Sequence, residues 1–351
     1  MVKMSFEAMT PYEQRAWQQS IGVLYAPSRR KLIPKKARDR ISSLGSAVVD
    51  RLSDLPGADQ VKEIAEKAFD GTLALTFQPA MRSARPDSIL KRYAERHQEV
   101  CTFGDIRKLS LEARDAMIPP KFGYTAASAG QGAVTALAVT GAEVATTVSG
   151  GTTAAVVVGA VAADSVASMA MMGRTIGVVA TRYGYDVRLP DEELFAMGVL
   201  SLGVAASLGS KTQALAALSR LTQQMMRQAT WRQLNEHVLV RAVAKAYQML
   251  GLRLTQRKLA QAVPFVGVAL NATLSAQLTE QTFRRAQAVY RLRWLSETYG
   301  IDPKEWMDGA PSADPVTDGT QEREEAVDVV EVLEDELAEE RELEDDSALA
   351  Q

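Results

Sequence analysis

The sequence predicts an all-α protein: a compact multi-helix bundle with a small-residue-rich helical hairpin at its centre and a disordered acidic C-terminal tail. Three observations lead to this prediction. Apolar residues recur at helical spacing along most of the chain, and no stretch shows the alternation typical of a strand. The 351 residues are 46% hydrophobic, which is enough for one large domain or two modest ones. Residues 311–351 hold 16 acidic and two basic side chains, a composition typical of disorder.

The net charge of −3 hides a strong asymmetry along the chain. The tail carries a net charge of −14, so residues 1–310 carry +11. The single cysteine, Cys101, excludes a disulfide scaffold and is compatible with a reducing cytoplasm. One cysteine and two histidines leave little for a zinc site, and the sequence indicates no metal or cofactor.

The N-terminal region, 1–120, is expected to be a helical layer. Thr10-Pro11-Tyr12-Glu13 places a capping hydroxyl, a proline and a glutamate where a helix begins, and the amphipathic pattern continues to Leu24. Further helical patterns cover 37–54, 59–76, 87–100 and 110–117. A basic stretch lies between the first helix and the second, and it includes Arg29, Arg30, Lys31, Lys35 and Lys36.

The segment 121–183 is rich in alanine, glycine and valine, and Gly150-Gly151 predicts a hairpin turn within it. Residues 144–163 carry no charge and are numerous enough to span a bilayer. They contain no leucine, isoleucine or phenylalanine, so each residue adds little insertion energy. This composition favours a closely packed buried helix over a transmembrane span, with reversible insertion into one leaflet as an intermediate alternative.

The second half of the chain predicts further helices with a strong basic excess. Asp191-Glu192-Glu193 begins one helix, with acids placed against its N-terminal dipole. Between positions 211 and 294 there are 13 basic residues and only two acidic ones. Pro264 breaks this region, and Val263-Pro264-Phe265-Val266-Gly267 introduces a long final helix that is expected to continue to about Tyr299.

Three stretches in this half carry a family resemblance. They are the helix of Asp164 leading to Tyr183-Gly184-Tyr185-Asp186, then 190–195, and then 263–285. In order and spacing they resemble the EcsC family, named for a gene beside a bacterial ABC transporter, over roughly 105–300. The resemblance implies an all-helical bacterial protein suspected of acting at the membrane, and it implies no catalytic residues. The expected regions are therefore 1–120, an EcsC-like core at 121–309, and the tail at 310–351.

One buried polar centre is predicted around Asp164, because a carboxylate within an apolar helix is costly unless it finds a partner. Arg174 lies about 15 Å further along the same helix, too far for a direct pair. The candidate centre comprises Asp164, Arg174, Asp186, Asn271 and Arg284, with Arg285 as a further partner for Asp164. It would bind a head group or move a proton; the favoured alternative is a structural pair that fixes helix register.

Other catalytic signals are weak. The glycine-rich segments lack the Lys-Ser/Thr of a phosphate loop, and no Gly-x-Ser-x-Gly is present. His97 and Cys101 lie one helical turn apart, where an accidental pair is favoured over a catalytic dyad. Gly184 is suited to a left-handed helix end, and the preferred interpretation of its surroundings is a helix stop. The sequence thus leans away from an enzyme.

The basic excess favours an anionic membrane surface as the partner, since each Lys or Arg near such a surface contributes about 1 kcal/mol. No nucleic-acid motif or aromatic stacking platform accompanies it, so membrane ranks above nucleic acid. The candidate lipid contacts are Arg29, Arg30, Lys31, Lys35, Lys36, Arg220, Arg227 and Arg241. The sequence therefore predicts a non-enzymatic, membrane-associated accessory or regulatory protein of the cytoplasm, peripheral or partly inserted at the inner face of the cell membrane.

Two alternatives stay open. One is a soluble enzyme of unknown reaction with its polar centre near Asp164. The other is a helical scaffold that recruits a basic partner through its acidic tail.

The tail itself contains a helical pattern, because Ala326, Val330, Leu333 and Leu337 recur at helical spacing among the acids. This spacing indicates a helix that forms on contact with a basic surface. The basic helices at 211–294 offer such a surface. We hypothesise that the tail lies over them and competes with anionic lipid or a protein partner.

Overall fold

The computed structural model describes residues 6–26, 78–119, 153–205, 207–227, 238–246, 248–250, 267–308 and 326–349. Within these ranges all regular structure is helical, with no strand, which confirms the predicted all-α class. The elements are α2 (Pro11–Tyr25), α5 (Pro86–Ala94), η1 (Phe103–Lys108), α6 (Leu111–Asp115), α8 (Thr153–Arg182), α9 (Pro190–Val204), α10 (Leu208–Met226), α12 (Gly267–Tyr299), η3 (Pro303–Met307) and α13 (Val329–Leu349). Residues 238–246 and 248–250 are also helical.

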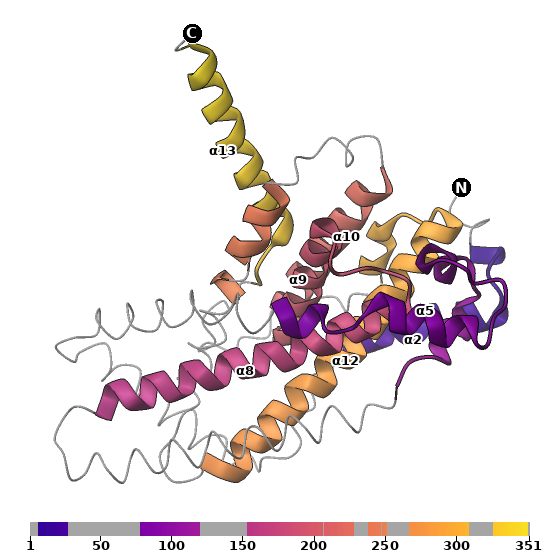
Figure 1. Ribbon diagram of the computed structural model, residues 1–351, viewed down its shortest axis with the longest axis horizontal. Helices are drawn as coiled ribbons and strands as arrows, with labels where there is room; N and C mark the ends of the chain where they lie inside the picture. The colour runs from indigo at the N-terminus through magenta and orange to yellow at the C-terminus, as the bar shows by residue number, and fades with distance from the viewer. Residues whose placement is uncertain are drawn as a thin grey trace.

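Helix α12 is the centre of the bundle, and α8, α2 and α9 pack around it (Figure 1). Helix α10 lies against α9 and η3. One hydrophobic core joins side chains from the N-terminal region, the central region and the tail, such as Trp17, Phe195 and Val330. This main core therefore crosses the sequence boundaries at 120 and 309, and a second, smaller cluster lies within the N-terminal region: Ile89, Tyr93, Val100, Ile106 and Leu109.

The N-terminal start signal of α2 is confirmed. The Thr10 amide donates to Glu13 Oε2 at 2.9 Å, and the Glu13 amide donates to Thr10 Oγ1 at 3.3 Å. These reciprocal bonds satisfy two amides that the helix leaves without an internal partner. The predicted end of the long final helix near Tyr299 is confirmed as well, since α12 ends there.

Two glycines end long helices in the left-handed conformation. Gly184 follows α8 with φ of 85°, and Gly300 follows α12 with φ of 65°. After α8, the Tyr185 amide donates to the Ala180 carbonyl at 3.0 Å and the Gly184 amide donates to the Thr181 carbonyl at 3.1 Å. This pattern is the Schellman motif, and it confirms the helix stop predicted at Gly184.

Two of the shorter predicted helices differ in extent from the structure. The pattern over 87–100 corresponds to α5, which ends at Ala94, and the pattern over 110–117 corresponds to α6, which ends at Asp115. The helices predicted at 37–54 and 59–76 lie outside the described residues, as does the Gly150-Gly151 turn.

The uncharged segment 144–163 is described only from position 153, where α8 begins. Among the residues that the structure describes, no helix is both long enough and apolar enough to cross a membrane.

The prediction of a disordered tail is wrong for 326–349, which includes helix α13. Val327, Val329 and Val330 are each at most 2% exposed and belong to the main core. Composition predicts disorder because it counts the many acidic residues without regard to their positions along the helix. The valines and leucines between them form one continuous apolar face. Burial of that face against the body supplies the stabilisation that the isolated segment lacks.

The two helix-ending glycines give a matched test of local packing. Gly300→Ala is expected to lower the free energy of unfolding by about 1 kcal/mol, the cost of a left-handed alanine. Gly184→Ala is expected to cost at least about 1 kcal/mol more, because of overpacking. A Cβ at position 184 meets Arg107 Cγ at 2.7 Å, whereas nothing lies within 4 Å of one at position 300. Urea unfolding measures both variants, and equal losses would contradict this packing account.

Candidate functional site

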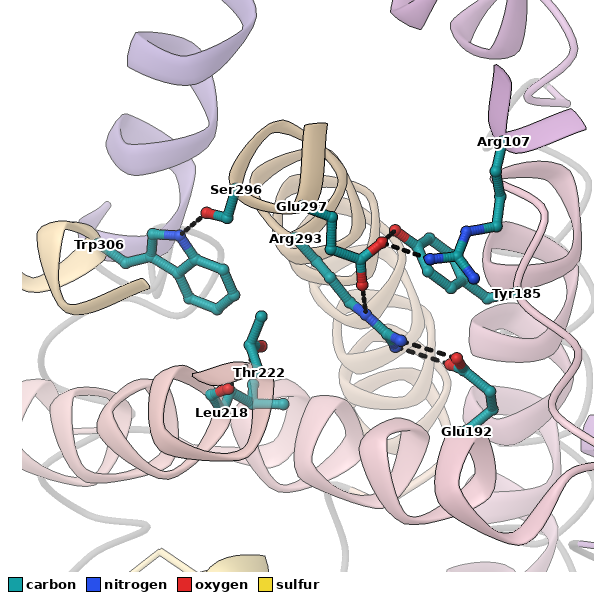
Figure 2. Close-up of polar contacts among 9 residues, drawn as sticks. All are labelled: Arg107, Tyr185, Glu192, Leu218, Thr222, Arg293, Ser296, Glu297 and Trp306. Atoms are coloured by element: carbon teal, nitrogen blue, oxygen red, sulfur yellow. Dashed lines mark hydrogen bonds and ion pairs between the residues drawn. The ribbon is translucent and has the colours of Figure 1, made fainter. Parts of the chain in front are cut away.

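The guanidinium of Arg293 on α12 is deeply buried, and the residue is only 2% exposed. It donates to both carboxylate oxygens of Glu192 on α9, at 2.6 and 2.7 Å. Its Nε donates to Glu297 Oε1, one turn further along α12, at 2.8 Å (Figure 2). Two carboxylates therefore hold one arginine in a fixed orientation.

The second oxygen of Glu297 extends this network to two other parts of the chain. Glu297 Oε2 accepts from Arg107 Nη2 at 2.6 Å and from the Tyr185 hydroxyl at 2.9 Å (Figure 2). The Arg293 guanidinium also lies over the rings of Tyr185 and Phe195, at 4.1 and 4.3 Å from their centroids. We call Arg107, Tyr185, Glu192, Arg293 and Glu297 the Arg293 cluster. It joins η1, the end of α8, α9 and α12.

The Arg293 cluster balances two positive and two negative charges. Burial opposes the charge on Arg293, but Glu192 and Glu297 outweigh it and raise the pKa of the guanidinium. Burial likewise opposes ionisation of Glu297, yet Arg293 and Arg107 hold the pKa of that carboxyl below its ordinary value. For Glu192 burial prevails over the attraction of Arg293, so its pKa is raised.

A second polar cluster surrounds Asp115 at the end of α6. Its carboxylate accepts from Arg291 Nε at 3.0 Å, from the Tyr12 hydroxyl at 2.7 Å and from the Tyr183 hydroxyl. Burial and the bond to Asp115 raise the pKa of Tyr12 to about 12. This carboxylate connects α2, the end of α8 and α12.

Arg114, next to Asp115, is fully buried, and its guanidinium lies 3.7 Å from the centroid of the Trp294 ring. Burial lowers its pKa to about 10. Its two terminal nitrogens have no hydrogen-bond partner, although Nε donates to the Ser110 carbonyl at 3.4 Å. The indole face therefore supplies much of the stabilisation of this cation.

The carboxylates of these two clusters take part in ion pairs between distant segments. The carboxylates of Glu192, Glu297 and Asp115 are all hydrogen-bonded to arginine. A general base needs an oxygen that is free to take a proton from a substrate. In the part of the chain that the structure describes, no group of three or more His, Cys, Asp or Glu residues is arranged to hold a metal ion.

The polar centre predicted around Asp164 is not formed by the candidates whose side chains are described. Arg174 is exposed on α8. Asp186 pairs with Arg188 two residues away, at 2.7 Å, and Arg284 pairs with Glu280 on its own helix. These charges find solvent or a neighbour in sequence, so no shared centre is needed to satisfy them.

Asp164 and Asn271 lie on α8 and α12, but their side chains are outside the described residues. Arg285, the further partner considered for Asp164, has another role. It is 4% exposed, and its Nη1 donates to the carbonyls of Leu202, Gly203 and Ala205 at 2.5, 3.0 and 2.9 Å. It thereby caps the C-terminal end of α9.

The acidic tail meets the body on a separate surface, where charge pairs surround an apolar contact. Asp328 pairs with Arg220 on α10. Glu336 pairs with Arg241 at 2.9 Å and with Lys245 at 3.4 Å. All three cations come from the region 211–294 that the sequence marks as basic, so this part of the tail does lie over it.

The apolar contact of the tail is made on α9 and α10. A Cβ placed on Gly198 would lie 2.7 Å from Leu218 and 3.2 Å from Val329. Two hydrogen bonds hold the start of the segment: Ser201 Oγ donates to the Val327 carbonyl at 2.9 Å, and the Ala326 amide donates to Gln213 Oε1 at 3.0 Å. We call the body side of this contact the tail-docking surface. It comprises Gly198, Ser201, Gln213, Leu218, Arg220, Arg241 and Lys245.

The predicted lipid contacts fall into three groups. Arg29, Arg30, Lys31, Lys35 and Lys36 lie outside the described residues. Arg227 is exposed at the C-terminal end of α10. Arg220 and Arg241 are partly exposed and paired with the tail, so they are not free cations as the sequence had suggested.

Sequence reasoning missed the Arg293 cluster, although one signal for it was present. Arg293 lies between Leu292 and Trp294, and it shares a helix face with Val289 and Tyr290, where a solvated arginine is out of place. Its partner Glu192 is 101 positions away. No local pattern identifies that pairing.

The model of the EcsC protein family matches residues 28–295, beginning well before position 105, where the sequence resemblance was placed. No curated protein and no solved structure matches the chain.

Removing the central guanidinium tests the Arg293 cluster. Arg293→Met is expected to lower the free energy of unfolding by about 3–5 kcal/mol, because it leaves Glu192 and Glu297 buried without their main partner. The control Arg188→Met removes a largely exposed arginine and is expected to cost no more than about 1 kcal/mol. Urea unfolding measures both. Equal, small losses would show that the cluster is not a structural constraint.

The pH dependence of Glu297 gives a second test. Its pKa in the folded state lies below its ordinary value of 4.5, so its ionised form stabilises the fold above about pH 4.5. This contribution is lost as the pH falls through the folded-state pKa. The stability difference between wild type and Glu297→Gln, measured by urea unfolding, should therefore narrow from pH 7 to pH 4. A difference that stays constant or widens would contradict the assignment; Glu331→Gln, exposed on α13, controls for the loss of a carboxylate.

Proposed function

The chain belongs to the EcsC protein family, and we propose that it is a non-enzymatic accessory or regulatory protein that binds an anionic membrane surface. The membrane surface we propose is the cytoplasmic face of the cell membrane. Binding would be peripheral or partly inserted, through basic helices and the Ala/Gly/Val-rich segment 121–183.

The observation that carries this proposal is the combination of basic and apolar groups on the tail-docking surface. The side chains of Arg220, Arg241 and Lys245 are 52%, 43% and 36% exposed, even with the tail in place. They pair with the same tail segment whose Val329 packs on the apolar positions Gly198 and Leu218. Each cation near an anionic membrane contributes about 1 kcal/mol, and apolar contact adds to it.

Two further features support the same function. The body carries a net charge of +11 over residues 1–310, including the basic stretch around Pro34. The N-terminal part of α8 contains no charged residue between positions 153 and 163, and Figure 1 shows it extending away from the end of the molecule where α2 and α5 lie. An uncharged helix end in that position suits insertion among lipid head groups.

The non-enzymatic part of the proposal is supported by the state of the buried polar groups. The carboxylates of the Arg293 cluster and of Asp115 are engaged by arginines and tyrosines from α2, η1, α12 and the turn after α8. Such bonds orient helices, and they leave these oxygens no proton-accepting role toward a substrate.

Vesicle co-sedimentation tests the proposal. The full-length protein should bind vesicles of equal parts phosphatidylglycerol and phosphatidylcholine at low salt, and should not bind pure phosphatidylcholine. Changing Arg29, Arg30 and Lys31 to glutamine should weaken binding by about a hundredfold, since three contacts of about 1 kcal/mol are lost. The matched control changes Lys91, Arg92 and Lys304, which are exposed on the body, and it should have little effect.

Two results would overturn the proposal. One is a full-length protein that stays in the soluble fraction with anionic vesicles at low salt. The other is an equal loss of binding in the two triple variants, which would indicate non-specific attraction by net charge.

A further inference from the structure

We infer that the tail-docking surface is one of the places where the body contacts the bilayer, and that helix α13 and an anionic membrane compete for it. This inference rests on the proposed function, because it identifies which surface does the binding and what covers it.

The tail segment that occupies the tail-docking surface presents both apolar and acidic side chains. Five apolar residues of the tail are each at most 3% exposed: Val327, Val329, Val330, Val332 and Leu333. Acidic residues border this row, with Asp328 at its start and Glu336 and Glu339 further along. The tail-docking surface is thus complementary to an apolar strip edged by carboxylates.

An anionic bilayer offers the same two features, negative charge and apolar surface. Its head groups carry negative phosphates or carboxylates, and apolar acyl chains lie directly beneath them. Arg220, Arg241 and Lys245 would bind the head groups, and the apolar positions of α9 and α10 would face the acyl boundary. The cations and the apolar positions contact one and the same tail segment, and this combination fits anionic phospholipid as the ligand class.

The attachment of α13 permits the helix to leave the tail-docking surface. Among the major helices it packs on α10 and α9, and Figure 1 shows its C-terminal half projecting away from the body. Residues 309–325 connect it to the body, and 17 residues reach about 55 Å when extended. The released helix would stay tethered, so it can return when the membrane is absent.

Membrane binding and the docking of α13 are coupled, and each opposes the other. Two ligands that bind one surface exclude each other, and linkage requires the effect to be reciprocal. Membrane binding should release α13, and loosening α13 should strengthen membrane binding. Both effects are measurable on the full-length chain.

The test uses two triple variants that remove the same number of negative charges from the tail. The release variant, Asp328→Asn with Glu336→Gln and Glu339→Gln, removes the acids that pair with the body. The control variant, Glu331→Gln with Glu334→Gln and Glu342→Gln, changes exposed acids for which no ion pair to the described body is recorded. Hydrogen exchange of 326–340 reports the release of α13, and co-sedimentation with phosphatidylglycerol vesicles reports binding.

The release variant should show faster exchange in 326–340 and about tenfold tighter vesicle binding than the control, since each partly exposed pair is worth about a factor of two. Adding Arg241→Gln and Lys245→Gln to the release variant should abolish that gain. In the wild type, anionic vesicles should accelerate exchange in 326–340.

The possible negative results of this test distinguish the competition from the proposed function. If the wild type binds vesicles but the release variant binds no better than the control, the competition is refuted and the proposed function stands. If no variant binds although α13 is released, the proposed function fails, and the inference with it. If the substitutions leave exchange in 326–340 unchanged, the ion pairs do not hold the tail and the inference is overturned. If the release variant forms a dimer by light scattering and ignores vesicles, the surface takes a second copy's helix and the lipid assignment is wrong.

Discussion

The double pairing of Arg293 with Glu192 and Glu297 is the constraint on which the rest of the structure depends. A buried guanidinium is costly unless its geometry is good and its donors are satisfied, so α9 and α12 must approach each other in one orientation. Fixing α9 has consequences on its other faces. Gly203 lies against Thr282 of α12, while Gly198 lies against Leu218 of α10 and Val329 of α13. Helix α9 therefore packs against the central helix α12 on one side and contributes to the tail-docking surface on another.

Ionic clusters of this kind are weak evidence for net stability, because an apolar replacement of similar volume often performs as well. Their value in a bundle lies in orientation. Helices α8, α9 and α12 are long and rich in small or apolar residues, and such helices can pack in several registers. The Arg293 cluster and the bonds to Asp115 distinguish one register from the others. We attribute to them the specificity of the fold rather than the bulk of its stability.

Local signals in the sequence predicted much of the helical framework. The capping box at Thr10 and the left-handed helix end at Gly184 each depend on residues within one or two turns, and the structure confirms both. The amphipathic pattern of the tail was also informative, since Val330 and Leu333 are buried. The disorder expected from the tail's composition was wrong for 326–349, because composition does not register which face of a helix is apolar.

The polar centre was not predictable in the same way. The sequence favours Asp164 as the polar centre, since it is a lone charge in an apolar run. The buried charges that pair with one another in the structure are instead Glu192, Arg293 and Glu297. In sequence Glu192 resembles an ordinary helix-start acid, and Arg293 resembles one basic residue among many. Asp115 and Arg291 meet across 176 positions. Such pairs are defined by the packing of distant helices, which a single sequence does not display.

The same surface that α9 and α10 build for the tail is the one that we assign to the membrane, and exchange between these two occupants is the central claim. The natural Cys101 is exposed and is the chain's single cysteine, so one substitution at the exposed Ala338 completes a pair of spin-label sites. Electron-spin distance measurement then follows α13 relative to the body. The account predicts one narrow distance distribution in solution, and a longer, broader one when phosphatidylglycerol vesicles are bound. A distribution that stays narrow and unchanged on fully vesicle-bound protein would contradict it.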